Sequence, residues 1–147
     1  MSKINLLSIL IATSLLTACG FHTPKNTSLN VSVAANPDNV LAAEFGEYLN
    51  LDAEKKLLVQ ISDEVRQQKT IAYRADGEAS SYTLSLNVPI KVLHNKKILL
   101  SRELKASMVI NDLSLQANRL QQDEYYVQLR KTVIKKLLRI LKRLNES

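Results

Sequence analysis

The sequence predicts an α+β domain in which roughly four strands form a mainly antiparallel sheet and two helices pack on one face. Three observations lead to this fold class. Two long segments in the middle of the chain alternate apolar and polar residues, a polar turn joins them, and segments with helical periodicity lie before and after. The resulting order of strand, helix, three strands and helix is typical of a sheet covered on one side.

The first two elements are predicted between residues 29 and 49. Leu29, Val31 and Val33 alternate with polar residues, which indicates a short strand. The segment 36–39 ends this strand and offers a cap for a helix. A short amphipathic helix is then predicted over 40–49, with an apolar face made of Leu41, Phe45, Tyr48 and Leu49.

The next part of the chain changes to a period of two. Apolar positions alternate over 57–61 and resume on the same parity at Ile71 and Tyr73, which fits one long strand or two short ones. Alternation over 82–92 gives the clearest strand of the chain. Pro89 in this strand lacks the N–H that a sheet ladder uses, so we expect a sheet edge or a bulge there.

An antiparallel hairpin and a covering helix complete the predicted domain. The turn 94–97 leads into a second alternating strand over 98–110. A helix is predicted over 118–144, and its apolar stripe is Val127, Ile134, Leu137, Leu138, Leu141 and Leu144. One of Tyr125 and Tyr126 is expected to pack on the sheet and the other to reach an interface. The basic residues of this predicted helix are expected to be solvated or to face lipid headgroups. They are Arg130, Lys131, Lys135, Lys136, Arg139, Lys142 and Arg143.

The start of the chain has the pattern of a bacterial lipoprotein precursor. Lys3 and the apolar run 6–16 form a signal peptide over residues 1–18, too short for a spanning helix. The run closes on the lipobox Leu16-Thr17-Ala18-Cys19, and the Cys19 thiol is the nucleophile that accepts the lipid. Residues 19–28 are interpreted as the lipid anchor and a polar tether. Gly20, in place of an aspartate, favours the outer membrane, so we expect a lipid-anchored protein on its periplasmic side.

The net charge and the export signal together limit the classes of molecule that this chain is expected to bind. The chain carries a formal charge of +6 and a single cysteine, so once Cys19 is acylated no disulfide is possible. Export excludes nucleic acid and leaves anionic lipids, phosphorylated glycans or acidic protein surfaces. Lipopolysaccharide is the most abundant candidate of this kind in the outer membrane.

The residue inventory argues against an enzyme. His22 and His94 are the only histidines, one in the tether and one in a turn, so neither a metal cluster nor a histidine-based acid–base pair is expected. No glycine-rich loop for a cofactor phosphate occurs. The carboxylates of Asp63, Glu64, Asp76 and Glu78 are interpreted as solvated strand ends. We therefore predict no catalytic, cofactor-binding or metal-binding residue.

Ordered short segments along the mature chain, from Cys19-Gly20-Phe21-His22 through Tyr73-Arg74 to Gln122-Asp123-Glu124, resemble the LPS-assembly lipoprotein LptE family. The start Cys19-Gly20-Phe21-His22 is similar to that of the family. So are the pair Tyr73-Arg74, the turn at Gly77, the opening Ser81-Tyr82, and Gln122-Asp123-Glu124 before Val127. The resemblance covers nearly the whole mature chain and implies a single LptE-like α+β domain over 29–147.

This resemblance implies a non-catalytic role in lipopolysaccharide transport. LptE proteins plug the β-barrel of LptD, support its folding and help to place lipopolysaccharide in the outer leaflet. The family's lipopolysaccharide-binding arginine corresponds to Arg74, whose planar guanidinium suits phosphates. A second basic position aligns with Asn118, next to Arg119, so Arg74 and Arg119 are the candidate binding residues. The residues alone also allow a solvated turn arginine at Arg74.

A free-standing envelope lipoprotein, acting as a scaffold or a cell-wall-binding module, is the alternative function. One feature of the predicted strands favours the barrel partner. The polar positions that alternate with the apolar ones hold small uncharged residues, which suit close approach to a polar barrel lumen. A solvated sheet more often carries lysine and glutamate at such positions. These residues are Thr83, Ser85, Asn87, Ser101 and Ser107.

Overall fold

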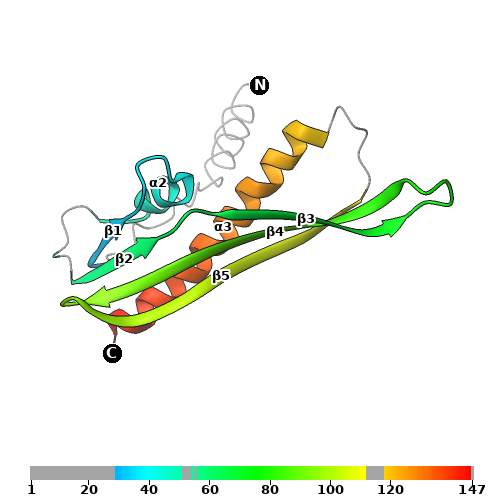
Figure 1. Ribbon diagram of the computed structural model, residues 1–147. Coiled ribbons are helices and arrows are strands. Elements are labelled where there is room, and N and C mark those ends of the chain that lie inside the picture. Colours follow the sequence, from blue (N-terminus) through cyan, green and yellow to red (C-terminus); the bar gives the residue numbers. More distant parts are fainter. Residues whose placement is uncertain (1–28, 51–53, 55, 112–117, 147) are drawn as a thin grey trace, which may run out of the picture.

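The computed structural model describes residues 29–50, 54, 56–111 and 118–146. The predicted signal peptide (1–18), Cys19 and the tether (19–28) lie outside the described residues. The elements are β1 (Val31–Ala34), α2 (Val40–Gly46), β2 (Leu57–Ile61), β3 (Val65–Tyr73), β4 (Ala79–His94), β5 (Lys97–Asn111) and α3 (Asn118–Asn145) (Figure 1). The predicted α+β fold is confirmed.

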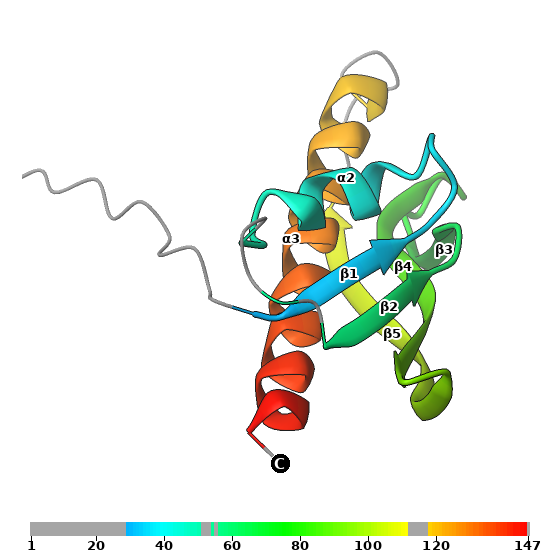
Figure 2. The same cartoon turned by 90° about the vertical axis from the view of Figure 1, so that its left-hand side faces the viewer.

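The five described strands form one mixed sheet around β4. β5 pairs antiparallel with β4 along its whole length, while β2 and β3 pair antiparallel with two successive parts of its other edge. β1 lies beyond β2 and pairs with it in parallel. α3 packs on β4 and β5, and α2 contacts both β1 and α3, so the two helices share one face (Figure 2).

The segment predicted as one long strand or two short ones forms two strands. Ser62, Asp63 and Glu64 separate β2 from β3, which raises the strand count from the expected four to five. Two asparagine side chains from the turn before α2 hold this break in place. Asn36 Nδ2 donates to both carboxylate oxygens of Asp63 at 3.0 Å, and Asn39 Nδ2 donates to the carbonyl oxygen of Ser62 at 3.1 Å.

Pro89 lies in the central strand of the sheet, so the expectation of an edge strand was wrong. Its carbonyl oxygen accepts the Ser62 N–H at 3.0 Å, so its ring nitrogen faces the same edge of β4. The ladder on that edge is interrupted there, because β2 pairs only as far as Ile90 and β3 begins at Asn87. The ladder is therefore interrupted between β2 and β3, opposite Pro89. At this gap the N–H that Pro89 lacks leaves no backbone acceptor without a partner.

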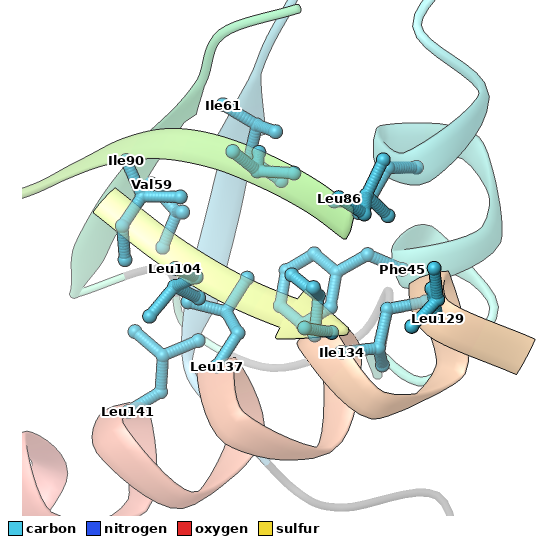
Figure 3. Packing of buried hydrophobic residues seen from close by; sticks show 14 of the residues in the cluster. Phe45, Val59, Ile61, Leu86, Ile90, Leu104, Leu129, Ile134, Leu137 and Leu141 are labelled. Atoms are coloured by element: carbon cyan, nitrogen blue, oxygen red, sulfur yellow. The ribbon is translucent and has the colours of Figure 1, made fainter. Parts of the chain in front are cut away.

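The core lies between the sheet and the two helices. Val59, Leu84, Leu86 and Val88 are fully buried from the sheet side, and Figure 3 shows Phe45 of α2 and Leu104 of β5 packed against α3. The predicted alternation over 82–92 is thus confirmed. In α3 the buried stripe begins one position earlier than expected, with Tyr126 and Leu129 in place of Val127, and continues as Val133, Ile134, Leu137 and Leu141.

The far part of the β3–β4 hairpin extends beyond the helices (Figure 1). Ile71 and Tyr73, expected to continue the apolar face of 57–61, are 48% and 68% exposed. Two register shifts, between Thr70 and Ala72 and between Ala72 and Tyr73, disturb the alternation there. Apolar residues in this part of β3 therefore face solvent.

Candidate functional site

Arg74 lies at the tip of the projecting β3–β4 hairpin. Its backbone N–H donates to the Glu78 carbonyl oxygen at 2.7 Å, and its own carbonyl oxygen accepts the Gly77 N–H at 3.0 Å. Gly77 has a φ of +86°, a conformation that favours glycine. Asp76 Oδ1 accepts the Glu78 N–H at 2.9 Å. These bonds make the turn compact, so Arg74 is presented from a defined backbone.

The Arg74 guanidinium is half exposed and lies near one carboxylate. Its Nη1 atom is 3.8 Å from Glu78 Oε2, and the Glu78 side chain is also largely exposed. Exposed ion pairs of this kind contribute little because water and salt screen them. The predicted role of Arg74 in phosphate binding stays a prediction.

The second predicted residue, Arg119, lies in the first turn of α3, but its side chain lies outside the described part of the structure. The neighbouring helical turn is located by Gln122, whose Nε2 donates to Gln68 Oε1 of β3 at 2.6 Å. Arg74 follows Gln68 by six residues, which corresponds to about 20 Å along an extended strand. The described backbone therefore does not bring the two candidate residues into one site.

The outer sheet face, turned away from α2 and α3, carries the small polar residues noted in the sequence. Ser85 pairs with Ser107 on one side and with Gln67 on the other. Lys91 pairs with Ser101, and Thr83 pairs with Val109, which is 61% exposed. At the far end of this face Ser81 Oγ donates to Asn111 Oδ1 at 3.0 Å. The face is wide and has few bulky side chains along β4.

A buried charge cluster, missed in the sequence, links α3 to α2 and to the break between β2 and β3. The Arg130 side chain is only 8% exposed. Its Nε lies 2.9 Å from Glu44 Oε1 and its Nη1 lies 3.4 Å from Glu64 Oε1. The expectation of a solvated Arg130 and a solvated Glu64 was therefore wrong. Arg130 follows Tyr126 by four residues and precedes Val133 by three, so it occupies the apolar stripe of α3, and this spacing was the available signal.

Arg66 extends this cluster to Tyr126. Arg66 Nη2 lies 2.6 Å from Glu64 Oε1, and the guanidinium carbon lies 4.8 Å from the centre of the Tyr126 ring. The Tyr126 hydroxyl donates to the Gln67 carbonyl oxygen at 3.3 Å. Burial raises the pKa of Tyr126, the positive charge of Arg66 lowers it and the negative charge of Glu64 raises it. Tyr126 thus packs on the sheet, and Tyr125 is also partly buried against the core.

Two features, a cluster of possible metal ligands and a helix able to span a membrane, are absent from the described residues. Among them, no three histidine, cysteine, aspartate or glutamate side chains are grouped so that they could hold a metal ion. No helix in the described ranges has both the length and the apolar composition needed to cross a membrane.

Comparison with solved structures reveals lipoproteins of similar fold. The solution structure of uncharacterized lipoprotein B from Nitrosomonas europaea has a TM-score of 0.66 and 15% identity, over 80% of this chain and 84% of that chain. Rare lipoprotein B from Shewanella oneidensis has a TM-score of 0.59 and 16% identity, over 79% and 93%. A putative lipoprotein from Caulobacter crescentus has a TM-score of 0.53 and 12% identity, over 80% and 91%. At these identities the similarity is one of fold.

No protein-family model matches this sequence, and no curated protein matches it either.

Proposed function

We propose that this chain is an outer-membrane lipoprotein that occupies an LptD-type β-barrel, supports its folding and helps to deliver lipopolysaccharide to the outer leaflet. The lipobox ending at Cys19 and the ordered resemblance to the LptE family support this proposal. Structures of similar fold are lipoproteins by name, which agrees with a lipid anchor.

The composition of the outer sheet face is the main support for a barrel partner. Long strands β4 and β5 present Ser85, Ser107 and Ser101 there, and short polar side chains allow a partner wall to approach the sheet closely. Glu103 and Lys105 on the same face form an ion pair at 2.9 Å, so part of the charge on this face is already balanced. A polar lumen could accept this surface without burying an isolated charge.

The partner is tested by purifying the full-length lipidated protein from outer membranes and identifying what remains bound after detergent washing. We expect a large β-barrel at equal stoichiometry, and depletion of the protein should reduce lipopolysaccharide export. Recovery of no barrel, or of peptidoglycan, together with normal export would refute the proposal and favour the scaffold or cell-wall-binding alternative.

A matched pair of variants tests the docking face itself. Ser107→Trp places a bulky group on the outer sheet face, whereas Gln128→Trp places the same group on an exposed position of α3. We expect Ser107→Trp to lower barrel recovery about tenfold, since a misfit of about 1.4 kcal/mol is sufficient. Equal recovery with both variants would exclude this face as the contact surface.

The lipopolysaccharide site is tested at Arg74. Arg74→Asp, alone or with Arg119→Asp, should weaken lipopolysaccharide binding without unfolding the domain, because a turn arginine contributes little to stability. Lys69→Asp makes the same change of charge at an exposed position of β3 and serves as the control. Unchanged binding in both arginine variants, or an equal loss with Lys69→Asp, would remove the assignment of this site.

A further inference from the structure

A groove lined by basic side chains lies between β5 and the C-terminal half of α3. It has a volume of about 280 Å³. Its lining residues are Arg102, Leu104, Lys136, Arg139, Ile140 and Arg143. The groove thus combines cationic side chains with an apolar floor, a combination suited to an amphiphile with an anionic headgroup.

No carboxylate neutralises this groove from its lining. Arg102 pairs with Ile90 across the strands, so it shares the inner face with the buried Leu104, while Glu103 alternates to the outer face and pairs with Lys105. Neither Arg102 nor Arg139 forms an ion pair with any described residue. Guanidinium groups without a carboxylate partner are ready donors for phosphate oxygens.

Positive charge extends beyond the groove over this whole end of the domain. We call it the basic end and define it as residues 31–34, 56–61, 90–102 and 136–145. These ranges contain no aspartate or glutamate. Their basic residues are Lys56, Lys91, Lys96, Lys97, Arg102, Lys136, Arg139, Lys142 and Arg143. Such a surface attracts anionic interfaces within a Debye length.

The chain enters the domain at the basic end. The first strand residue, Val31, lies opposite Leu57, and Leu57 lies opposite His94 at the β4–β5 turn. β1 and β5 are separated by β2 and β4, a distance of about 14 Å across the sheet. A tether that leads into β1 therefore brings the basic end, rather than the Arg74 hairpin, to the membrane that holds its anchor.

We propose that the groove between β5 and α3 binds the phosphate of an anionic phospholipid headgroup, so that the basic end rests on the bilayer. The orientation on the bilayer rests on the lipid anchor of the proposed function, whereas the phosphate site does not. The site is also separate from Arg74, which lies at the tip of the opposite hairpin.

The test uses the processed full chain, purified from membranes in neutral detergent micelles and titrated by calorimetry with three probes. These probes are short-chain phosphatidylglycerol, short-chain phosphatidylcholine and inorganic phosphate. The double variant Lys136→Gln with Arg139→Gln removes two groove charges. The control, Lys131→Gln with Lys135→Gln, removes two exposed charges from the same helix outside the groove.

We expect phosphatidylglycerol to bind at least about tenfold more tightly than either other probe, and the groove variant to lose about tenfold in affinity. The control variant should change affinity by less than about twofold. Equal losses in the two variants, or equal binding of the two lipids, would overturn the proposal. Inorganic phosphate binding as tightly as phosphatidylglycerol would overturn the lipid as the source of the phosphate.

Intact mass of the same preparation separates this result from the proposed function. A chain without acyl groups would refute the lipid anchor and the orientation on the bilayer. The three titrations would still decide whether the groove binds a lipid phosphate, because they do not depend on the anchor.

Discussion

The two ends of the domain differ in whether their basic side chains have carboxylates nearby. At the basic end, the basic residues are matched by no carboxylate within the same ranges. The other end, which we call the paired end, comprises residues 62–89, 103–111 and 121–135. There basic and acidic residues occur in equal number and ion pairs are frequent: Arg66–Glu64, Arg66–Asp123, Arg74–Glu78, Lys105–Glu103 and Arg130–Glu64. The helix α3 contributes to both ends: Arg130 in its first half forms buried ion pairs with Glu44 and Glu64, whereas Arg139 in its second half forms no ion pair with a described residue and Lys142 lies 4.0 Å from Glu146 at the end of the helix.

The largest effect is expected from removing Arg130 at the paired end. Arg130→Ala leaves the half-buried carboxylates of Glu44 and Glu64 without their shared partner, and breaking such a buried pair costs about 3 kcal/mol. Urea unfolding should show this loss as a lower midpoint. The neighbouring Lys131→Ala is the control and should change the free energy of unfolding by less than about 0.5 kcal/mol. Similar stability of both variants would show that the cluster is not structural.

A smaller effect is expected at Tyr126. Tyr126→Phe removes the hydroxyl that donates to the Gln67 carbonyl oxygen, and this should cost about 1 kcal/mol in urea unfolding. Tyr126 also predicts a pH dependence. Because its pKa is raised in the folded state, its contribution to stability is full below about pH 10 and decreases as the pH rises further. The Phe variant should lack this alkaline decrease, and an identical pH profile in the two proteins would contradict the burial of the hydroxyl.

The turns at the two ends provide a third test. Gly77 occupies the left-handed conformation in the β3–β4 turn, whereas Asn95 and Lys96 occupy it in the β4–β5 turn, with φ values of 49° and 67°. A lysine in this conformation is strained, so Lys96→Gly should stabilise the domain by about 0.5 to 1 kcal/mol. Lys97→Gly, in the adjoining strand, should instead destabilise it by a similar amount. The two thermal midpoints should therefore move in opposite directions.

The smallest expected effect is that of salt on the basic end. Screening weakens repulsion among like charges, so raising NaCl from about 0.01 to 0.15 M should stabilise the domain by a few tenths of a kcal/mol. The double variant Lys136→Gln with Arg139→Gln should gain less, because it carries less repulsion. Urea midpoints at the two salt concentrations measure this difference, and a larger gain in the variant would show that the groove charges do not repel one another.

Local patterns predicted the central part of the fold and failed where distant parts of the chain meet. The alternation over 82–92 identified the buried face of β4 because each residue there packs on the covering helices. The same periodicity did not show that the hairpin extends past those helices, and therefore Ile71 and Tyr73 are exposed. At Pro89 neither the expected edge strand nor the expected bulge forms, because the ladder is interrupted between β2 and β3 instead and this gap depends on Ser62, which is distant in sequence.

For the candidate site, too, local sequence predicted the residues with nearby partners and missed those with distant ones. Arg74 was predicted at a turn, and its turn geometry follows from Gly77 and Asp76 nearby. Arg130 was missed because its partners, Glu44 and Glu64, are 86 and 66 residues away along the chain. The groove depends likewise on Arg102 in β5 facing Arg139 in α3, a proximity that only the packing of α3 on the sheet creates.

The parallel pairing of β1 with β2 has a consequence for the order of folding. β3, β4 and β5 are joined by two tight turns, so their contacts close short loops and form early. Val31 meets Leu57 only after α2 and the connection behind it have closed a much longer loop. We expect a β3–β4–β5 nucleus to form first and β1 to join it last, so that the segment leading from the N-terminus is secured in the final step of folding.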